Sequence, residues 1–253
     1  MNRRHFLSSG TFATAAWLGA RQSMLARTQA TATPPTPAAP SDAIPYGITK
    51  LNLSDDLRDG SLYVPKSYRD DVPAPVAVML HGYSGFGDEM KSTFAIAEEL
   101  GVVVVAPDSR DVTWGRSAPG FDADVRYIGA AFRKAADLVN IDPDRVALGG
   151  RSDGAGYALS MGLAYGDTFN HLIVIAGGMM APLRRKGKPK VFLAHGVNDQ
   201  QMPIERTGRL FQKQLKDDGY DVTYREYEGG HATPPEVVRE AFVWLVGPKK
   251  TPR

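Results

Sequence analysis

The chain has 253 residues, which is enough for one domain, or a domain with an appendage, around a large core. Its composition, 43% hydrophobic and 23% charged, is ordinary for a globular protein. It contains no cysteine, which excludes disulfide bonds, thiolate metal ligands and a cysteine nucleophile. The formal net charge of only +2 provides no global case for nucleic-acid binding.

Residues 1–32 differ from the rest of the chain. An arginine pair, Arg3 and Arg4, precedes a weakly apolar run rich in Ala, Gly and Thr, and the segment has no acidic residue. This layout resembles a bacterial export signal of the twin-arginine type. The alternative is a membrane anchor, but the run is shorter than the roughly 18 apolar residues that spanning needs and has polar breaks. We predict a signal peptide cleaved after Ala30 or Ala32, and an exported (periplasmic or extracellular) mature protein with no stable membrane span.

The mild basicity belongs to this signal. Residues 1–30 hold four arginines, so the rest of the chain has 26 basic and 28 acidic residues and a formal charge of −2. We therefore expect no nucleic-acid partner. Residues 33–46 follow as a proline-rich spacer that is expected to be extended.

From residue 47 to residue 248 short apolar runs alternate with amphipathic segments. Strands are predicted at 61–65, 76–82, 101–108, 145–150, 171–178 and 190–196, with an alternating edge strand at 221–228. Helices are predicted near 90–100, 122–139, 154–165, 203–219 and 234–246. Most apolar runs are continuous, so both faces of these strands must be covered. The pattern predicts an α/β fold with a doubly wound, mostly parallel sheet flanked by helices.

Five polar residues lie at the ends of these strands or within a few residues of them. They are His81, Asp108, Ser152, Asp199 and His231. In open parallel sheets, ligands bind beyond the carboxyl ends of the strands. We therefore expect a single site at this edge.

Ser152 lies in the sequence Gly150-Arg151-Ser152-Asp153-Gly154, between a predicted strand and a predicted helix. A sharp strand-to-helix turn would present the serine above the sheet in a strained backbone conformation. Residues two positions away on either side must then lack side chains. The alternative is a plain glycine-rich turn, but the flanking strand and helix favour a nucleophile at Ser152.

A serine nucleophile needs a general base, and the chain has five histidines. His5 lies in the predicted signal, and His171 begins a strand at the other edge of the sheet. His81 and His195 each precede a glycine at a strand end. Each of them could line the site or have a structural packing role, and the sequence leaves both roles open. His231 follows two glycines in the loop before the last helix, and this place favours it as the base over a loop histidine without function.

The acid that orients the base should lie between the serine and His231. Asp199 follows a buried strand and is the predicted acid, which would hold His231 in the right tautomer and stabilise its protonated form. Glu228 is the alternative, but it ends the strand that leads into the histidine's own loop. Aspartates at 217–221 lie at a helix end and are expected to be solvated.

Acyl transfer also needs donors for a developing oxyanion. We expect them in the backbone N–H of Asp153, directly after the serine, and of Tyr83, in a glycine-rich loop. A plain glycine-rich turn is the alternative for that loop. No histidine pair or carboxylate cluster has the spacing of a metal site, so neither a metal nor another cofactor is expected.

With these motifs, the chain resembles an α/β-hydrolase, and more narrowly the bacterial phospholipase/carboxylesterase group, which also contains acyl-protein thioesterases. The similarity covers nearly all of 60–246, including "MLHGYSG", "VVAPDSR", "GGRSDGAG", "AHGVNDQQMPI" and "GGH". The resemblance implies the same roles for Ser152, Asp199 and His231. Arg151 stands where relatives usually have an aromatic residue or histidine, and Gln201 where an aliphatic is usual, so the substrate preference does not carry over.

The sequence thus predicts an exported serine hydrolase that cleaves small-molecule or lipid carboxylic esters through an acyl-enzyme. A thioesterase or peptidase with the same triad is one alternative, and a non-catalytic periplasmic binding protein is another. Little length remains for a cap domain, so a fairly open site is expected. Trp114, Met179 and Met180 are candidates for its rim or for packing.

Overall fold

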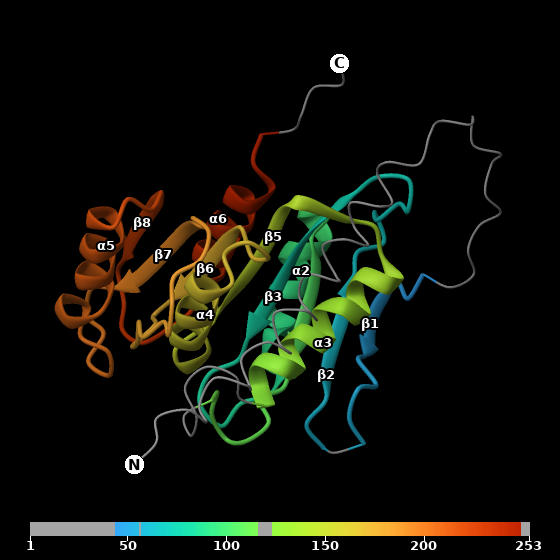
Figure 1. Cartoon of the computed structure of the whole chain (residues 1–253), viewed down its shortest axis with the longest axis horizontal. Helices are drawn as coiled ribbons and strands as arrows, with labels where there is room; N and C mark the ends of the chain where they lie inside the picture. Colours follow the sequence, from blue (N-terminus) through green and yellow to red (C-terminus); the bar gives the residue numbers. More distant parts are fainter. Residues whose placement is uncertain (1–43, 56, 116–122, 249–253) are drawn as a thin grey trace, which may run out of the picture. The chain divides into compact units, whose positions relative to one another are not determined.

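A computed structural model describes residues 44–55, 57–115 and 123–248 (Figure 1). The predicted signal peptide (1–32) and nearly all of the predicted spacer (33–46) lie outside the described residues. The compact unit that begins at Pro45 is built around an eight-stranded sheet.

The sheet is mostly parallel. Its strands are β1 (Gly47–Lys50), β2 (Gly60–Val64), β3 (Ala74–Leu80), β4 (Val103–Pro107), β5 (Ile141–Arg151), β6 (His171–Ile175), β7 (Lys190–Gly196) and β8 (Val222–Tyr227). Their spatial order is β1-β2-β4-β3-β5-β6-β7-β8. The pairs β1–β2 and β2–β4 are antiparallel, and all others are parallel. The carboxyl ends of the six parallel strands therefore meet at one edge.

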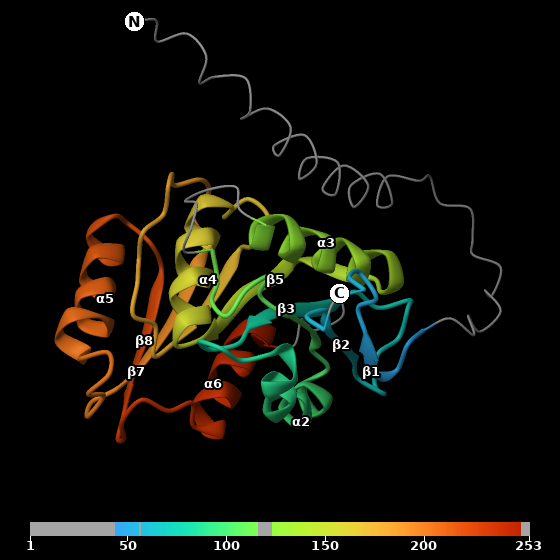
Figure 2. The ribbon, with the colours of Figure 1, turned by 90° about the horizontal axis from the view of Figure 1, so that it is seen from below.

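Helices cover both faces of the sheet. They are η1 (Gly87–Met90), α2 (Lys91–Leu100), α3 (Ala123–Leu138), α4 (Asp153–Ala164), η2 (Ile204–Arg206), α5 (Gly208–Asp217) and α6 (Pro235–Val246). In Figure 2, α3 and α4 lie on one face, and α2 and α6 lie together on the other. Because both faces are covered, every residue of β3 and β4 is buried, which explains their continuous apolar runs. The predicted doubly wound α/β architecture is confirmed.

Some boundaries differ from the prediction. Strand β1 is not among the predicted strands: its four residues alternate between half-buried and exposed positions at the sheet's edge. The predicted strand at 171–178 ends at Ile175, because Ala176 adopts a φ of 53° that cannot continue a strand. The predicted helix at 203–219 is divided into η2 and α5, because Thr207 has a φ of −129° and a ψ of −92°, outside the helical region.

Strand β8 has the alternating burial expected of an edge strand. Within the described ranges, each connection between strands holds at most two helices, as in η1 and α2 or η2 and α5, and no separate cap domain. No helix in this part of the chain is long and apolar enough to cross a membrane.

Candidate active site

Ser152 occupies the turn between β5 and α4. Its φ of 53° and ψ of −119° are rare for a residue with a side chain, so the backbone is strained. The surrounding structure holds this conformation: the Ser152 N–H donates to the carbonyl of Ile175 at 3.0 Å, and the Ser152 carbonyl accepts from the N–H of Gly156 at 3.1 Å. The hydroxyl is thus presented at the carboxyl end of β5.

The glycines on either side of the turn are required by the end of β3. A Cβ on Gly150 would lie 2.5 Å from the carbonyl oxygen of Leu80, and one on Gly154 would lie 2.3 Å from that of His81. Neither distance is possible between real atoms without a backbone shift. The two glycines therefore let β3, β5 and α4 converge at the serine, as the sequence motif predicted.

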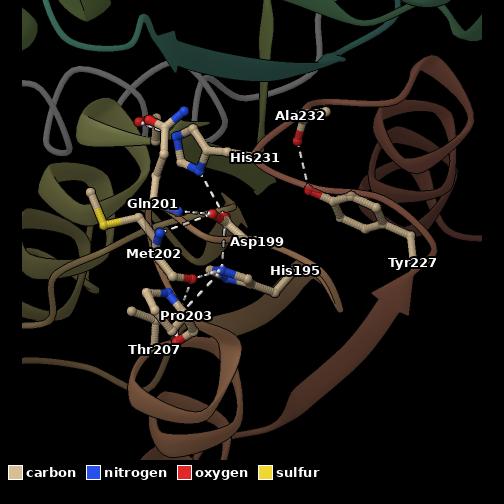
Figure 3. A network of polar contacts seen from close by, with 10 residues as sticks. His195, Asp199, Gln201, Met202, Pro203, Thr207, Tyr227, His231 and Ala232 are labelled. Carbon is tan, nitrogen blue, oxygen red and sulfur yellow. Dashed lines mark hydrogen bonds and ion pairs between the residues drawn. The ribbon is translucent and has the colours of Figure 1, made fainter.

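Three side chains from distant parts of the sequence are hydrogen bonded in series. The Ser152 hydroxyl donates to Nε2 of His231 at 2.7 Å, and Nδ1–H of His231 donates to Oδ2 of Asp199 at 2.7 Å. Ser152 follows β5, Asp199 follows β7, and His231 follows β8. The parallel strands thus bring together the serine, acid and histidine that the sequence motifs indicated. Figure 3 shows the acid and the histidine of this series.

Asp199 is fully buried and surrounded by donors. Its Oδ1 accepts the backbone N–H groups of Gln201 at 2.9 Å and Met202 at 2.8 Å. Its Oδ2 lies 2.7 Å from Nδ1 of His231 and 3.2 Å from Nε2 of His195 (Figure 3). Burial by itself would raise the pKa of the Asp199 carboxyl. The hydrogen bond from Met202 and the contact with His231 outweigh burial and lower the pKa below its usual value, so the carboxylate stays ionised.

The alternative acid lies apart from this series. Glu228 directly follows β8 and its side chain is exposed to solvent. Nδ1 of His231 instead meets Asp199. The geometry therefore favours Asp199 as the acid partner of His231.

The two backbone N–H groups expected as oxyanion donors belong to segments at the serine. Asp153 is the first residue of α4, where N–H groups have no partner within the helix. Tyr83 lies in the loop after β3. The carbonyl oxygen of His81, in the same loop, lies close to Gly154 at the start of α4. The next residue, Ser84, has a φ of 54°, and its N–H donates to the carbonyl of Val112 at 2.6 Å.

Arg58 ties this loop to the loop after β4. Its guanidinium donates to the carbonyl of Gly85 at 2.6 Å and to the carbonyl of Ser109 at 2.6 Å. It also lies over the ring of Phe86, 4.3 Å from the centroid. Sequence reasoning missed this residue, because an arginine in the polar stretch "LRDG" has the pattern of an ordinary surface loop.

The remaining described histidines have different surroundings. His81 is fully buried: its Nδ1–H donates to the carbonyl of Gly82 at 2.7 Å and its Nε2 accepts the N–H of Ser109 at 3.0 Å, which is a packing role. His171 begins β6, at the opposite end of the parallel strands, where burial lowers its pKa to about 4. His195 contacts the acid itself.

Trp114 packs beneath the site rather than forming its rim. It is 1% exposed, and its indole N–H donates to the carbonyl of His81 at 2.9 Å. Met179 is 42% exposed and lies against Gly156 of α4, so it remains a candidate for the rim.

A pocket of about 230 Å³ lies beside the turn, on the side of α2 and α6. Arg151 and Glu89 form an ion pair there, and the side chains are 38% and 37% exposed. Its other lining residues include Met79, Met90, Ile175 and Val238. The pocket therefore has apolar residues, one charged pair and three residues with hydroxyl groups in its walls, the last being Ser92, Thr93 and Thr233. In the described ranges, no group of three or more histidine or acidic side chains is arranged to hold a metal ion.

No protein-family model matches the chain. Over 115 residues the chain is 31% identical to acyl-protein thioesterase 1 of Gibberella zeae, a match that covers 42% of this chain and 48% of that protein. The chain spans less than half the length of the curated relatives that it matches, 48% of one and 42% of another.

Solved structures of hydrolases share the fold. Substrate-bound fluorophosphonate-binding serine hydrolase F of Staphylococcus aureus superposes with a TM-score of 0.63 at 15% identity, covering 76% of this chain and 93% of that one. The Bacillus cereus carboxylesterase superposes with a TM-score of 0.56 at 19% identity, covering 73% of this chain and 92% of that one. At these identities the likeness shows a common architecture.

Proposed function

We propose that this chain, which has the α/β-hydrolase fold, is a serine hydrolase that cleaves carboxylic esters through an acyl-enzyme. The observation that supports the proposal most is the series of hydrogen bonds from Ser152 through His231 to a buried, ionised Asp199. Folding alone does not require this series, nor a strained serine at its end. Both belong to the chemistry of an activated nucleophile.

In the first step, the Oγ of Ser152 attacks the carbonyl carbon of the ester. Its proton passes to Nε2 of His231, which lies 2.7 Å away. The carbonyl π electrons move to oxygen and produce a tetrahedral oxyanion. Asp199 remains ionised and stabilises the imidazolium that forms.

The oxyanion needs fixed donors in a place where water is excluded. We assign this role to the backbone N–H of Asp153, at the positive end of α4, and to that of Tyr83. Because these donors belong to the backbone of a strained turn and a pinned loop, they need little reorganisation as the charge develops.

The intermediate then collapses. The bond to the alcohol oxygen breaks, His231 gives its proton to that oxygen, and an acyl-serine remains. A water molecule attacks the acyl carbon while His231 takes a proton from that water. A second collapse returns the proton to Ser152 Oγ and releases the carboxylic acid. Nothing but ester and water is consumed.

Covalent labelling tests the nucleophile. A fluorophosphonate probe should modify the wild-type protein on the peptide that contains Ser152, and Ser152→Ala should remain unlabelled. The variant should also lose ester hydrolysis by roughly 10³-fold or more. The matched control is Ser160→Ala on the same helix, whose hydroxyl is occupied by the carbonyl of Gly156 and the N–H of Ala181. If Ser152→Ala keeps more than about a tenth of the activity, the nucleophile assignment is wrong.

Thioester hydrolysis is the second candidate, because the curated match is to an acyl-protein thioesterase. A panel of an oxygen ester, a thioester and an anilide with the same acyl group separates the possibilities. We expect the oxygen ester to have the highest kcat/KM. A higher value for the thioester would favour the second candidate, and a higher value for the anilide would favour a peptidase. Labelling without turnover of any of them would point to a non-catalytic protein.

Export is a separate proposal that rests on the sequence of residues 1–32 alone. We propose that Arg3 and Arg4 direct the chain to the twin-arginine export route, in which a receptor recognises the arginine pair. Replacing both with lysine should retain precursor in the cytoplasm, as fractionation and immunoblotting would show. An unchanged exported yield would instead indicate the general secretory route.

A further inference from the structure

Two histidines share one oxygen of Asp199. Nδ1 of His231 and Nε2 of His195 lie 2.7 Å and 3.2 Å from the same Oδ2. Figure 3 shows the carboxylate between the two rings. Both rings could in principle be protonated next to this carboxylate. The contacts of each ring decide which of them takes the proton of Ser152 in the proposed reaction.

The tautomer of His195 follows from its partners. Nε2 lies 2.7 Å from the carbonyl oxygen of Met202, which can only accept a hydrogen bond, so Nε2 carries a hydrogen. The same N–H is shared with Oδ2 of Asp199. Nδ1 is buried and has no hydrogen-bond partner among the described residues. A second proton on Nδ1 would therefore form a buried, unpaired donor next to its positive charge.

Burial also disfavours a charged His195. The side chain is fully buried, and burial is the main cause that lowers the pKa of His195. A proton on His231 would lower it further, because two positive rings would face one carboxylate. The ionisable or charged groups around the ring come from the loops after β7 and β8, from β8 and from α5: Asp199, His231, Glu226, Tyr224 and Arg209.

The His195 side chain is closely packed against the start of α5. Gly208, the first residue of α5, packs so closely that a Cβ there would lie 2.8 Å from Cβ of His195. The Thr207 hydroxyl oxygen lies 3.3 Å from Nε2, and its single hydrogen faces the carbonyl oxygens of Met202 at 3.2 Å and Pro203 at 2.9 Å. The N–H of His195 is therefore held in place relative to Oδ2.

We propose that His195 is a positioning residue for Asp199: as a permanently neutral ring it donates one shared N–H to Oδ2, directs that oxygen toward His231, and leaves His231 alone to take the proton of Ser152. The inference rests on the proposed function for its kinetic consequence. Its structural content, the tautomer and charge of His195, stands independently of any activity.

The first test reads the tautomer directly. In ¹H–¹⁵N correlation spectra of the full chain, with the ring assigned by His195→Gln, His195 should remain in the single Nε2–H tautomer between about pH 5 and 8. An Nδ1–H tautomer, or protonation of His195 within that range, would overturn the proposal. This result does not depend on whether the chain hydrolyses esters.

The second test compares three variants. His195→Leu removes the donor to Oδ2, so Asp199 should hold a protonated His231 more tightly. The acidic limb of the kcat/KM–pH profile should then move up by about half a pH unit, and kcat should fall roughly tenfold with little change in KM. His195→Gln can present an amide N–H from a similar position. It should therefore have most of the wild-type kcat and an acidic limb close to that of the wild type. Ile204→Ala shortens a buried side chain of the same loop and removes no hydrogen bond of His195 or Asp199, so it should leave the acidic limb in place.

The outcomes separate the two proposals. If Ser152→Ala abolishes hydrolysis while His195→Leu leaves kcat and the acidic limb unchanged, the inference about His195 is wrong and the proposed function stands. If Ile204→Ala moves the acidic limb as far as His195→Leu does, His195 only supports the fold of the loop, and the inference is again wrong. If His195→Leu fails to fold, the tautomer spectra test the proposal. An Nδ1–H tautomer or a protonated His195 in these spectra would still overturn it.

Discussion

At the scale of single residues, the site depends on which carboxylate meets His231. Glu228 is three residues from the histidine in sequence and Asp199 is 32 residues away. Yet Asp199 is the buried group with four donors around it, and Glu228 is exposed. A buried ionised carboxylate is stable only with such partners, and in the same surroundings it interacts strongly with a protonated ring.

We therefore predict opposite results for two amide substitutions. Asp199→Asn should lower kcat by roughly 10³- to 10⁴-fold, because an amide can favour the wrong tautomer of His231 and cannot stabilise its charge. Glu228→Gln should leave kcat within about twofold. Steady-state kinetics on a short-chain ester, with circular dichroism to check folding, measures both. If Glu228→Gln is the crippling change, the acid has been misassigned.

At the scale of structural elements, the loops after β3 and β4 act as a unit. Arg58, in the connection between β1 and β2, donates to carbonyls of both loops, and the N–H of Gly87 donates to the carboxylate of Asp108. Tyr83 lies in the first of these loops. The position of one proposed oxyanion donor thus depends on an arginine that does not touch the serine.

Arg58→Lys should loosen the loop at 82–87, because an ammonium group lacks the planar fork that reaches both carbonyls. We expect kcat to fall roughly tenfold with a smaller change in KM, and the amides of Ser84 and Gly85 to exchange faster with deuterium. Arg69→Lys is the matched control: Arg69 forms a pair with Asp71 in which both side chains are largely exposed, at 71% and 64%. Unchanged exchange together with unchanged kcat would show that Arg58 does not position the loop.

At the scale of the whole molecule, three buried histidines make stability depend on pH. Burial lowers the pKa of His81, His171 and His195. In the unfolded chain a histidine takes up a proton below about pH 6.5, whereas folded His171, with its pKa of about 4, does not. The unfolded state then binds more protons at this residue, so the contribution of His171 to the free energy of unfolding falls as the pH falls from about 6.5 toward 4 and levels off below.

His171→Gln should reduce this dependence, because the uncharged amide takes up no proton in either state. Urea unfolding of the wild type at about pH 7.5 and about pH 5 should show a loss of stability, of which His171 contributes about 1–2 kcal/mol. The loss in the variant should be smaller by that amount. Identical losses in both proteins would mean that His171 does not stay neutral in the folded state.

The sequence by itself determined the architecture and the local form of the serine turn. Continuous apolar runs such as that of β3 require covered faces, and this requirement leads to a parallel sheet between helices. Gly150 and Gly154 predict the close approach of backbone around Ser152, which the carbonyls of Leu80 and His81 make. These features are readable because periodicity and steric freedom are properties of short stretches of chain.

Only the tertiary structure decided which distant side chains meet. The break at Thr207, the contacts of Arg58 with two loops, and the position of His195 against Asp199 depend on how the ends of separate strands align in space. A histidine before a glycine at a strand end has the same local pattern whether it packs, as His81 does, or contacts an acid, as His195 does. Local pattern does not contain the registers of β5, β7 and β8, and it is these registers that place the three loops of the site beside one another.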